Sequence, residues 1–578
     1  MTTRRARWLR TALCSGAMIF STDPNEAEQQ MHAVIFYLTT FGYVDGDFDA
    51  AEKDYVRTTI EKLVRERAES AMKAEAAAAR EEIVKKFTKH FHEVFEGVDA
   101  RIRDLFNEPV SKDEDPKTFV LSKLKLRCFE IFQEFPREAQ DSLMATIDEL
   151  IMADGTAHPA ELEFRGELAR LLDDEVGVEL EEDDSQAPPV MVQGPAHVPP
   201  AKVVHPFFAP AELHYSRDPD VIAQQTNADL ALIQRAMDTL DELRKTGNGR
   251  LAGKKSIAEI PPGPPFLDGH VYGVMPKAGA RYELTVLGDL HGCYSVLKAA
   301  VLQSRFFERV EAYKKDPTQP YPMLVLLGDY IDRGLFSLNG VLRAVLSLLV
   351  AAPEHVFVLR GNHEYYIEFK GNIYGGVKPA ESINTLKGHV PLDVFRKYAQ
   401  LFDTLPNVLL FDRMFFVHGG IPRDRSLKEK WVDLSSLNDA DLRFQMMWSD
   451  PSTADVVPAS LQDASARFAF GRHQLRAFLQ KVGSHTVVRG HEKTNAGFEH
   501  VYKDGDAQLF TLFSAGGADN DDLPSDSSYR TVTPMAMTVR FGPDGTTVTP
   551  WAPDYKTFNA PEYNAFFRAP PEIAHKAD

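Results

Sequence analysis

The sequence predicts an all-α domain followed by an α/β domain built as a two-sheet sandwich flanked by helices. From residue 27 to about residue 174, apolar residues recur at spacings of three and four, which is typical of amphipathic helices. From residue 281 onward, short apolar runs that suit buried strands alternate with helical patterns. The chain has 578 residues, which is too many for one hydrophobic core, so at least two domains are expected.

These patterns divide the chain into four segments. Residues 1–180 are predicted to form the helical domain. An acidic run and a proline-rich stretch at 187–210 indicate an extended linker over residues 181–216. Residues 217–280 indicate one amphipathic helix followed by a connector. The connector is expected to be irregular, because residues 261–265 are Pro-Pro-Gly-Pro-Pro. Residues 281–578 are expected to form the α/β domain, with a helix over 335–349 between its second and third strands.

Composition excludes several classes of function. The net charge of −19 disfavours nucleic acid as a partner, because an acidic surface repels the phosphate backbone. No apolar stretch is long enough to span a bilayer, and the arginine-rich N-terminus lacks the cleavage site of a secretory signal. Only three cysteines occur, so neither a disulfide framework nor a cysteine-rich metal site is expected. We expect a cytoplasmic protein with no membrane and no nucleic-acid partner.

Two segments of the helical domain, residues 32–64 and 143–172, resemble each other. Each indicates an apolar helix, a turn containing Asp-Gly, and a second helix that begins near a glutamate, Glu52 or Glu161. The Asp-Gly-x5-Glu spacing also occurs in EF-hand loops, but aromatic or aliphatic residues stand at loop positions one and three, so calcium is not expected. The two hairpins resemble the TerB-like family of helical domains. That resemblance implies a regulatory or interaction domain with a protein partner.

Five predicted strands of the α/β domain each end at a turn rich in polar residues. A buried strand presents the residues after its C-terminal end at the sheet edge, so residues far apart in sequence can meet there. The five turns are Gly-Asp-Leu-His-Gly at 288–292, Gly-Asp-Tyr-Ile-Asp-Arg-Gly at 328–334, Arg-Gly-Asn-His-Glu at 360–364, His-Gly-Gly-Ile-Pro at 418–422 and Arg-Gly-His-Glu at 489–492.

These turns supply six candidate metal ligands, expected at one common edge. Carboxylate and amide oxygens mixed with imidazole nitrogens, without thiolates, suit two borderline divalent cations better than a closed structural zinc site. Any single residue of this kind is more often structural, whereas a full set at consecutive strand ends indicates a binuclear metal centre. The six candidates are Asp289, His291, Asp329, Asn362, His418 and His491.

Taken in order, the five turns strongly resemble the PPP family of metallophosphatases over about residues 281–515. Met-Trp-Ser-Asp-Pro at 447–451, Phe-Gly at 470–471 and Phe-Ser-Ala at 513–515 also stand where that family has similar elements. The resemblance implies a metallophosphoesterase fold and two divalent or mixed-valence metal ions, Mn²⁺ or else Fe or Zn. It also implies hydrolysis of phosphoserine and phosphothreonine in proteins by a metal-bridging hydroxide, without a phosphoenzyme.

Roles assigned to the residues of the turns agree with this resemblance. Asp329 ends a central strand between the two ligand groups and is therefore the expected bridging carboxylate. The other ligands divide into one pair and one trio: Asp289 with His291, and Asn362 with His418 and His491.

Four further residues are expected to act on the substrate. Arg333 and Arg489 should face the phosphoryl oxygens, since a guanidinium matches two of them at once. His363 should protonate the leaving alkoxide, which departs poorly without a proton. Asp332 should accept a hydrogen bond from His363 and keep it charged.

Some features depart from the family and leave alternatives open. The usual Pro-Asn-Tyr-Cys after Ser-Ala is replaced by Gly-Gly-Ala-Asp-Asn-Asp-Asp at 516–522, so the tyrosine that overhangs the site is absent at Ala518 unless Tyr529 replaces it. The acidic loop is expected to repel acidic phosphopeptides. The alternative functions are a small-molecule phosphohydrolase, such as a dinucleoside-polyphosphate hydrolase, and a catalytically silent metal-binding scaffold.

Overall fold

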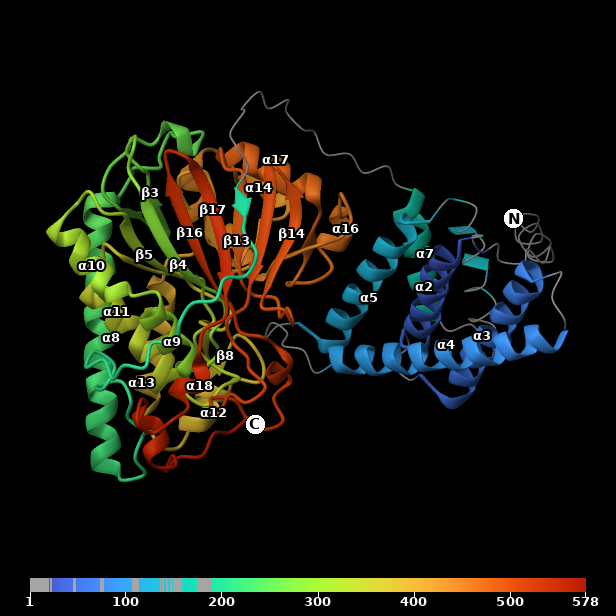
Figure 1. Cartoon of the computed structure of the whole chain (residues 1–578), viewed down its shortest axis with the longest axis horizontal. Helices are drawn as coiled ribbons and strands as arrows, with labels where there is room; N and C mark the ends of the chain where they lie inside the picture. Colours follow the sequence, from blue (N-terminus) through green and yellow to red (C-terminus); the bar gives the residue numbers. More distant parts are fainter. Residues whose placement is uncertain are drawn as a thin grey trace. The chain divides into compact units, whose positions relative to one another are not determined.

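The computed structural model describes residues 20, 23–44, 48–72, 77–106, 114–135, 137, 140–141, 144–145, 148, 159–173 and 190–577. Contacts between Cα atoms divide the chain into two compact units, one composed mostly of residues before 178 and one composed mostly of residues 178–578 (Figure 1). No helix in the described ranges is long and apolar enough to cross a membrane.

The first unit consists of helices, three of which begin at aspartate caps. Asp23, Asp49 and Asp115 each accept a hydrogen bond from a backbone N–H in the first turn of the helix that follows. Glu52 completes a capping box by accepting a hydrogen bond from the backbone N–H of Asp49 over 2.9 Å. The helices are α2 (Pro24–Gly42), α3 (Ala50–Ala71), α4 (Ala77–Leu105), α5 (Pro116–Gln133) and α7 (Pro159–Asp173).

Helix α2 lies at the centre of this unit and contacts α3, α4 and α5. Its aromatic side chains pack edge-on against the other helices: Tyr37 against Phe132 with ring centroids 4.3 Å apart, and Phe41 against Phe164 at 5.1 Å. Helices α2 and α3 form the first predicted hairpin. The Asp-Gly turns at 45–46 and 154–155 lie outside the described residues, as does most of the first half of the second hairpin.

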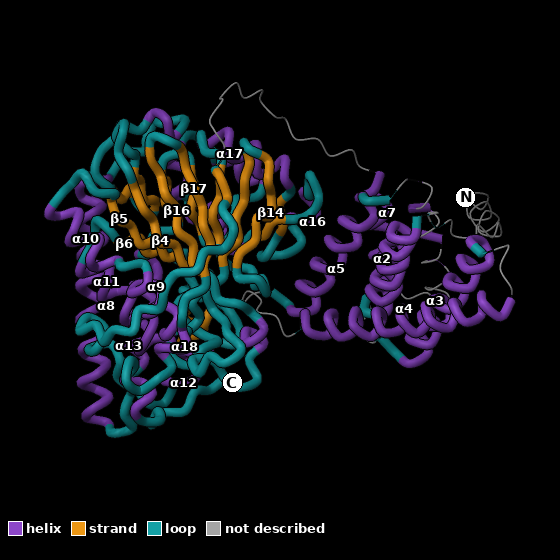
Figure 2. The backbone as a smooth tube through the Cα atoms, in the orientation of Figure 1, coloured by secondary structure: helices purple, strands orange, loops and turns teal. Residues whose placement is uncertain are grey.

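The second unit contains two large sheets (Figure 2). One half of the six-stranded sheet is parallel, because β4 pairs with β5 and β5 with β6 at the edge, and β16 joins β4 antiparallel. Its order is β1 (Met191–Val192), β17 (Gly545–Trp551), β16 (Ala536–Gly542), β4 (Tyr282–Leu287), β5 (Tyr321–Leu326) and β6 (Val356–Val358). The seven-stranded sheet is mixed. Its order is β14 (Phe498–Asp504), β15 (Ala507–Leu512), β13 (Thr486–Arg489), β10 (Met414–Val417), β9 (Val408–Phe411), β3 (Val271–Val274) and β2 (Phe266–Asp268).

The largest apolar core joins side chains of both sheets, including Leu284 and Val286 from β4 and Leu409 and Phe416 from β9 and β10. Helices cover the outer faces, since α10 contacts β5, α11 contacts β6 and α17 contacts β15. The helices are α8 (Pro219–Gly247), α9 (Tyr294–Gln303), α10 (Phe306–Lys315), α11 (Arg343–Ala351), α12 (Glu381–Leu386), α13 (Leu392–Thr404), α14 (Asp424–Lys430), α15 (Ala440–Trp448), α16 (Ala459–Gln462), α17 (Arg472–Val482) and α18 (Tyr555–Phe558). This layering confirms the predicted sandwich.

Smaller elements complete the second unit. Two short ladders, β7 (Tyr366–Phe369) with β8 (Asn372–Gly375) and β11 (Asp450–Pro451) with β12 (Ala469–Phe470), stand apart from the large sheets. The helix predicted over 335–349 is present, with a π-helical turn Ser337–Leu342 leading into α11. Short 3₁₀ turns lie at Ile257–Glu259, Leu434–Asn438, Ser528–Thr531 and Ala565–Arg568.

Over the described residues 190–280, the structure differs from the predicted linker (181–216) and from the irregular part of the predicted connector (217–280), while the predicted amphipathic helix is present as α8. Strand β1 pairs in parallel with β17, and Phe208 is fully buried in the main core. Strands β2 and β3 belong to the seven-stranded sheet, and α8 contacts β2, α11 and α13. Residues 190–280 are therefore part of the same compact unit as residues 281–578. Prolines do not prevent such packing at a sheet edge, where a missing N–H is tolerated.

Candidate metal centre

The five polar turns meet where strands of both sheets end. Strands β4, β5 and β6 lead into the turns at 288–292, 328–334 and 360–364, while β10 and β13 of the second sheet lead into those at 418–422 and 489–492. The turns were predicted to meet at the edge of one sheet, but they meet at strand ends of two different sheets. All six candidate ligands are buried there: Asp289, His291, Asp329, Asn362, His418 and His491.

The backbone of these turns is strained. His291, Asp329, Asp332, Arg333 and His491 all have positive φ, between 42° and 69°, a conformation that favours glycine. Such residues cost about 1–3 kcal/mol each and persist where the surrounding structure holds them, most often at functional sites.

Two glycines allow the turns to approach the carboxylates closely. A Cβ atom on Gly361 would lie 2.1 Å from Oδ1 of Asp329, and one on Gly490 would lie 2.3 Å from Oδ1 of Asp289. Both distances are far below van der Waals contact, so these positions exclude any side chain. Because no side chain intervenes, the backbone can approach and bind a carboxylate. The N–H of His491, next to Gly490, donates to Oδ1 of Asp289 over 2.8 Å.

The first ligand group surrounds His291. Its Nδ1–H donates to the carbonyl of Ile331 over 3.0 Å, which leaves Nε2 as an acceptor. Nε2 lies 3.5 Å from Oδ2 of Asp329 and 3.8 Å from Oδ2 of Asp289. Burial and the neighbouring His363 lower the pKa of His291 to about 3, so the ring is neutral, as a metal ligand must be.

The second ligand group surrounds His418. Its Nδ1–H donates to the carbonyl of Leu327 over 3.1 Å, and its Nε2 lies 2.9 Å from Oδ1 of Asn362 and 3.4 Å from Oδ2 of Asp329. Nδ1 of His491 lies 3.1 Å from the same Asn362 oxygen. Oxygen and nitrogen atoms held this close together are arranged like the ligand atoms around a cation.

The unsatisfied atoms of the centre also fit a cation. Oδ2 of Asp289 and Nε2 of His491 are buried and have no hydrogen-bond partner among the described residues. Burial alone would lower the pKa of His418, but the carboxylates of Asp329 and Asp289 raise it to about 9. The negative potential in this pocket therefore attracts a positive charge, which a divalent metal ion would supply.

His363 lies beside the ligands and is held by Asp332. Nδ1 of His363 donates to Oδ2 of Asp332 over 2.8 Å, and its Nε2 lies 4.0 Å from Oδ2 of Asp329. The second oxygen of Asp332 accepts from the backbone N–H of Ser382 over 2.8 Å. Burial lowers the pKa of His363, but Asp329 and the bond to Asp332 raise it overall above its ordinary value. This arrangement suits an acid.

The two predicted arginines are both tied to acidic side chains. Arg333 donates to both carboxylate oxygens of Glu381 at 2.8 and 2.9 Å. Arg489 is fully buried, and it donates to Oδ1 of Asp450 over 2.8 Å and to the carbonyl of Gly419. Arg333 helps to lower the pKa of His291, and Arg489 helps to lower that of His491, so both arginines lie near the centre. The phosphate-facing role of each arginine stays a prediction.

Sequence reasoning missed three supporting carboxylates. Glu364 accepts hydrogen bonds from the backbone N–H groups of Asp329, Tyr330 and Gly361 at 2.8, 2.8 and 3.0 Å, so it fixes the turn that carries Asp329. The sequence offered one indication of this role, because Glu364 directly follows His363 in the polar turn at 360–364. Asp450 lies in the Met-Trp-Ser-Asp-Pro element, which was its available signal, whereas Glu381 carries no signal of its role because its pairing with Arg333 is made by packing.

The loop after Ser514-Ala515 differs from expectation. Asp522 is fully buried and accepts hydrogen bonds from the backbone N–H and the hydroxyl of Ser295, at the start of α9. Asp522, one of the acidic residues expected to repel phosphopeptides, is therefore buried and stabilises the start of α9. The ring of Tyr529 lies 5.4 Å from that of His291, so this tyrosine borders the metal centre although Ala518 stands at the family's position.

Comparisons with known proteins agree with this geometry. Residues 282–494 match the model of the calcineurin-like phosphoesterase family. The chain is 28% identical over 236 residues to the catalytic subunit of serine/threonine-protein phosphatase 6 from Caenorhabditis elegans. That match covers 40% of this chain and 64% of the relative, so the chain spans less than two thirds of the relative's length.

Solved structures of similar proteins include two phosphatases. One is a protein serine/threonine phosphatase from Saccharomyces cerevisiae with similarity to human phosphatase PP5, at 18% identity and a TM-score of 0.37, with 57% of this chain and 90% of that chain covered. The other is a cold-active protein-tyrosine phosphatase of Shewanella, at 17% identity and a TM-score of 0.29, with 49% and 82% covered. Residues 282–494 thus match the calcineurin-like phosphoesterase family, the buried His and Asp groups at the strand ends agree with that match, and the chain is similar in sequence to a serine/threonine-protein phosphatase.

Proposed function

We propose that the protein hydrolyses phosphate monoesters, with phosphoserine and phosphothreonine of proteins as its substrates. The position of Asp329 carries this proposal. Its Oδ2 lies 3.5 Å from Nε2 of His291 and 3.4 Å from Nε2 of His418, which belong to different ligand groups. One carboxylate within reach of both groups suits a binuclear centre of the kind that phosphatases use. Similarity to a serine/threonine phosphatase supports a phosphoprotein as the substrate.

The ligands would divide between two ions, with Asp329 within reach of both groups. One ion would be held by Asp289 and His291, and the other by Asn362, His418 and His491. Bound divalent cations would supply Lewis acidity and lower the pKa of a water molecule that attacks phosphorus. Mn²⁺, Fe and Zn all accept this mixture of oxygen and nitrogen donors.

The protein's own residues would handle the proton and the phosphate. His363 protonates the departing serine or threonine oxygen through Nε2, since its Nδ1 is bound to Asp332. Arg333 would bind phosphoryl oxygens from a side chain that Glu381 holds in place. Arg489 would need to release part of its network, which includes the bond to Asp450, to do the same.

The first unit would serve this activity as a regulatory or interaction domain in the cytoplasm. The aspartate-capped helices around α2 form a unit with its own buried core, which supports a separate role. All the candidate ligands lie in the second unit. We therefore expect the helical unit to bind a protein partner and not to supply catalytic groups.

Metal reconstitution with a panel of substrates tests the proposal. Protein stripped of metal would be given Mn²⁺, Fe²⁺ or Zn²⁺ in turn. Turnover of phosphoserine, phosphothreonine and phosphotyrosine peptides would then be compared with turnover of a dinucleoside polyphosphate. We expect metal-dependent release of phosphate from the first two peptides. Preference for the dinucleoside polyphosphate would replace the substrate assignment, and no turnover with any metal would indicate a silent scaffold.

A further inference from the structure

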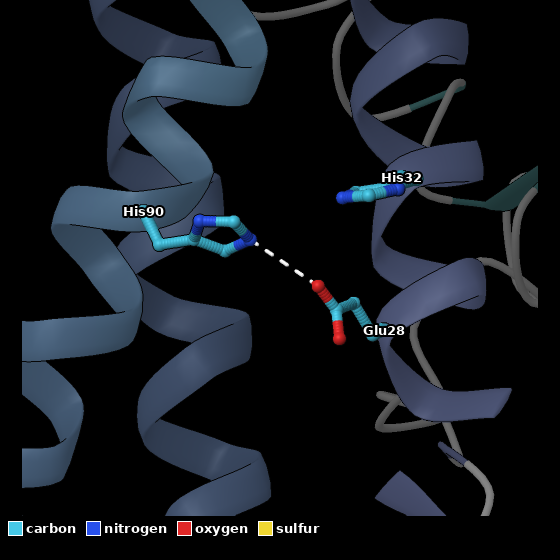
Figure 3. Close-up of side chains that lie close together, drawn as sticks. All are labelled: Glu28, His32 and His90. Atoms are coloured by element: carbon cyan, nitrogen blue, oxygen red, sulfur yellow. Dashed lines mark hydrogen bonds and ion pairs between the residues drawn. The ribbon is translucent and has the colours of Figure 1, made fainter. Parts of the chain in front are cut away.

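Three potential metal-binding side chains meet on the surface of the helical unit. Glu28 and His32 lie on α2 and His90 lies on α4 (Figure 3). One carboxylate oxygen and one ring nitrogen from each histidine lie within 4.8 Å of one another. Figure 3 shows the three side chains directed toward one gap between the two helices. None of these residues belongs to the centre at the strand ends.

The helices hold the three donors in register. Glu28 and His32 are four residues apart, so they lie one above the other on one face of α2. Helix α4 packs against α2, and buried Phe91 contacts both histidines, with ring centroids 5.9 Å from His32 and 5.0 Å from His90. The aromatic ring thus fixes the two imidazoles near each other without closing the site.

The distances fit a small cation. Nε2 of His90 lies 3.3 Å from Oε1 of Glu28. Around a tetrahedral zinc ion with bonds of about 2.0–2.1 Å, neighbouring donors lie about 3.3 Å apart. Glu28 and His90 already have this separation, and a ring nitrogen of His32 lies within 4.8 Å of both. An ion pair needs only a glutamate and one histidine, so the third donor at the same point is what favours a cation.

We propose that Glu28, His32 and His90 bind a divalent transition-metal ion, Zn²⁺ in the first instance. Two imidazole nitrogens and one carboxylate suit Zn²⁺, Ni²⁺ or Cu²⁺, whereas Ca²⁺ and Mg²⁺ require mainly oxygen ligands. The side chains of His90 and Glu28 are 44% and 46% exposed, so an ion can enter from solvent and keep a water or an outside ligand in its fourth position. The ion would clamp α2 to α4.

Metal counting in the full chain tests this site. Zinc bound after equilibrium dialysis would be measured for the wild type, Glu28→Gln, His90→Ala and Glu28→His. We expect the first two variants to hold one ion fewer per chain, with affinity at that site reduced roughly tenfold or more. Glu28→His should retain the ion, because it restores a third donor. His92→Ala, two residues along the same helix and bonded to the carbonyl of Arg57, is the matched control and should keep the wild-type count.

The test separates this site from the centre in the second unit. Phosphatase activity should be unchanged in all of these variants, and circular dichroism checks that the helices are retained. Zn²⁺ should raise the unfolding temperature of the helical unit in the wild type and in His92→Ala but not in His90→Ala. An equal zinc count in the wild type and in both Glu28→Gln and His90→Ala would overturn the proposal and leave Glu28 and His90 as an ion pair only.

Discussion

Asp332 accepts a hydrogen bond from Nδ1 of His363 over 2.8 Å, and both side chains are buried. This bond fixes the tautomer and the orientation of the ring, so Nε2 faces Asp329 and the centre. Positive φ at Asp332 and the donor from Ser382 keep the carboxylate in place. The pair therefore has the geometry that the proposed proton donor requires, with Nε2 directed at the centre before substrate binds.

Removal of the His363 ring should affect substrates according to their leaving groups. His363→Ala should slow hydrolysis of a phosphoserine peptide by about 10²–10⁴-fold, because an alkoxide departs poorly without a proton. An aryl phosphate with a good leaving group should lose far less. Steady-state rates on both substrates measure the difference. Equal losses would mean that His363 is not the acid.

Removal of a candidate ligand should reduce both metal content and activity. Asp289→Asn and His491→Ala each take away a buried donor that the remaining residues cannot replace, so phosphate-ester hydrolysis should be abolished. Elemental analysis and turnover measure the two effects. His473→Ala, outside the five turns, is the control and should bind metal normally. Full activity with two ions in either ligand variant would disprove the assignment.

Glu364 should control the stability of the turn that carries Asp329. Glu364→Gln places an amide N–H₂ among three backbone N–H donors, so unfolding free energy should fall by about 1–3 kcal/mol and metal content should fall with it. Denaturant unfolding and metal analysis check this prediction. Glu368→Gln, which loses only an exposed ion pair with Arg396, should change neither quantity appreciably.

His270 should make the second unit sensitive to acid. Burial and the nearby Arg443 lower its pKa from 6.5 to about 4. Below pH 6.5 the unfolded chain binds a proton that the folded state excludes, so stability is full above pH 6.5 and falls toward pH 4, by up to roughly 3 kcal/mol. Urea unfolding followed by fluorescence of Trp431, Trp448 and Trp551 at two pH values measures the loss. His270→Gln should reduce the difference between the two pH values, and an unchanged difference would contradict the assignment.

The boundary of the second unit should lie near residue 190. A chain beginning at residue 190 should fold and hydrolyse a small phosphate ester, because β1 pairs with β17 and Phe208 fills the core. A chain beginning at Asp218 would lose both, and the buried phenylalanine alone is worth about 3–5 kcal/mol. Thermal unfolding of the two chains compares them. If the longer chain is folded and metal-loaded but inactive, the helical unit must complete the site.

The sequence alone determined the chemistry of the centre and the order of its parts. The five apolar runs became strands β4, β5, β6, β10 and β13, and each turn kept its polar residues at the end of its strand. Strand runs and glycine turns are local patterns, so they can be recognised without knowing what packs against them. The donor types likewise follow directly from residue identity.

Only the tertiary structure decided how these parts meet. It divided the ligands between two sheets, and it paired Arg333 with Glu381 and Arg489 with Asp450, which no motif connects. It also placed the proline-rich segment on the second unit through the pairing of β1 with β17. These contacts join residues far apart in the chain, and they depend on the shapes of packed surfaces. Local periodicity does not encode such contacts, because it records only which face of an element is apolar.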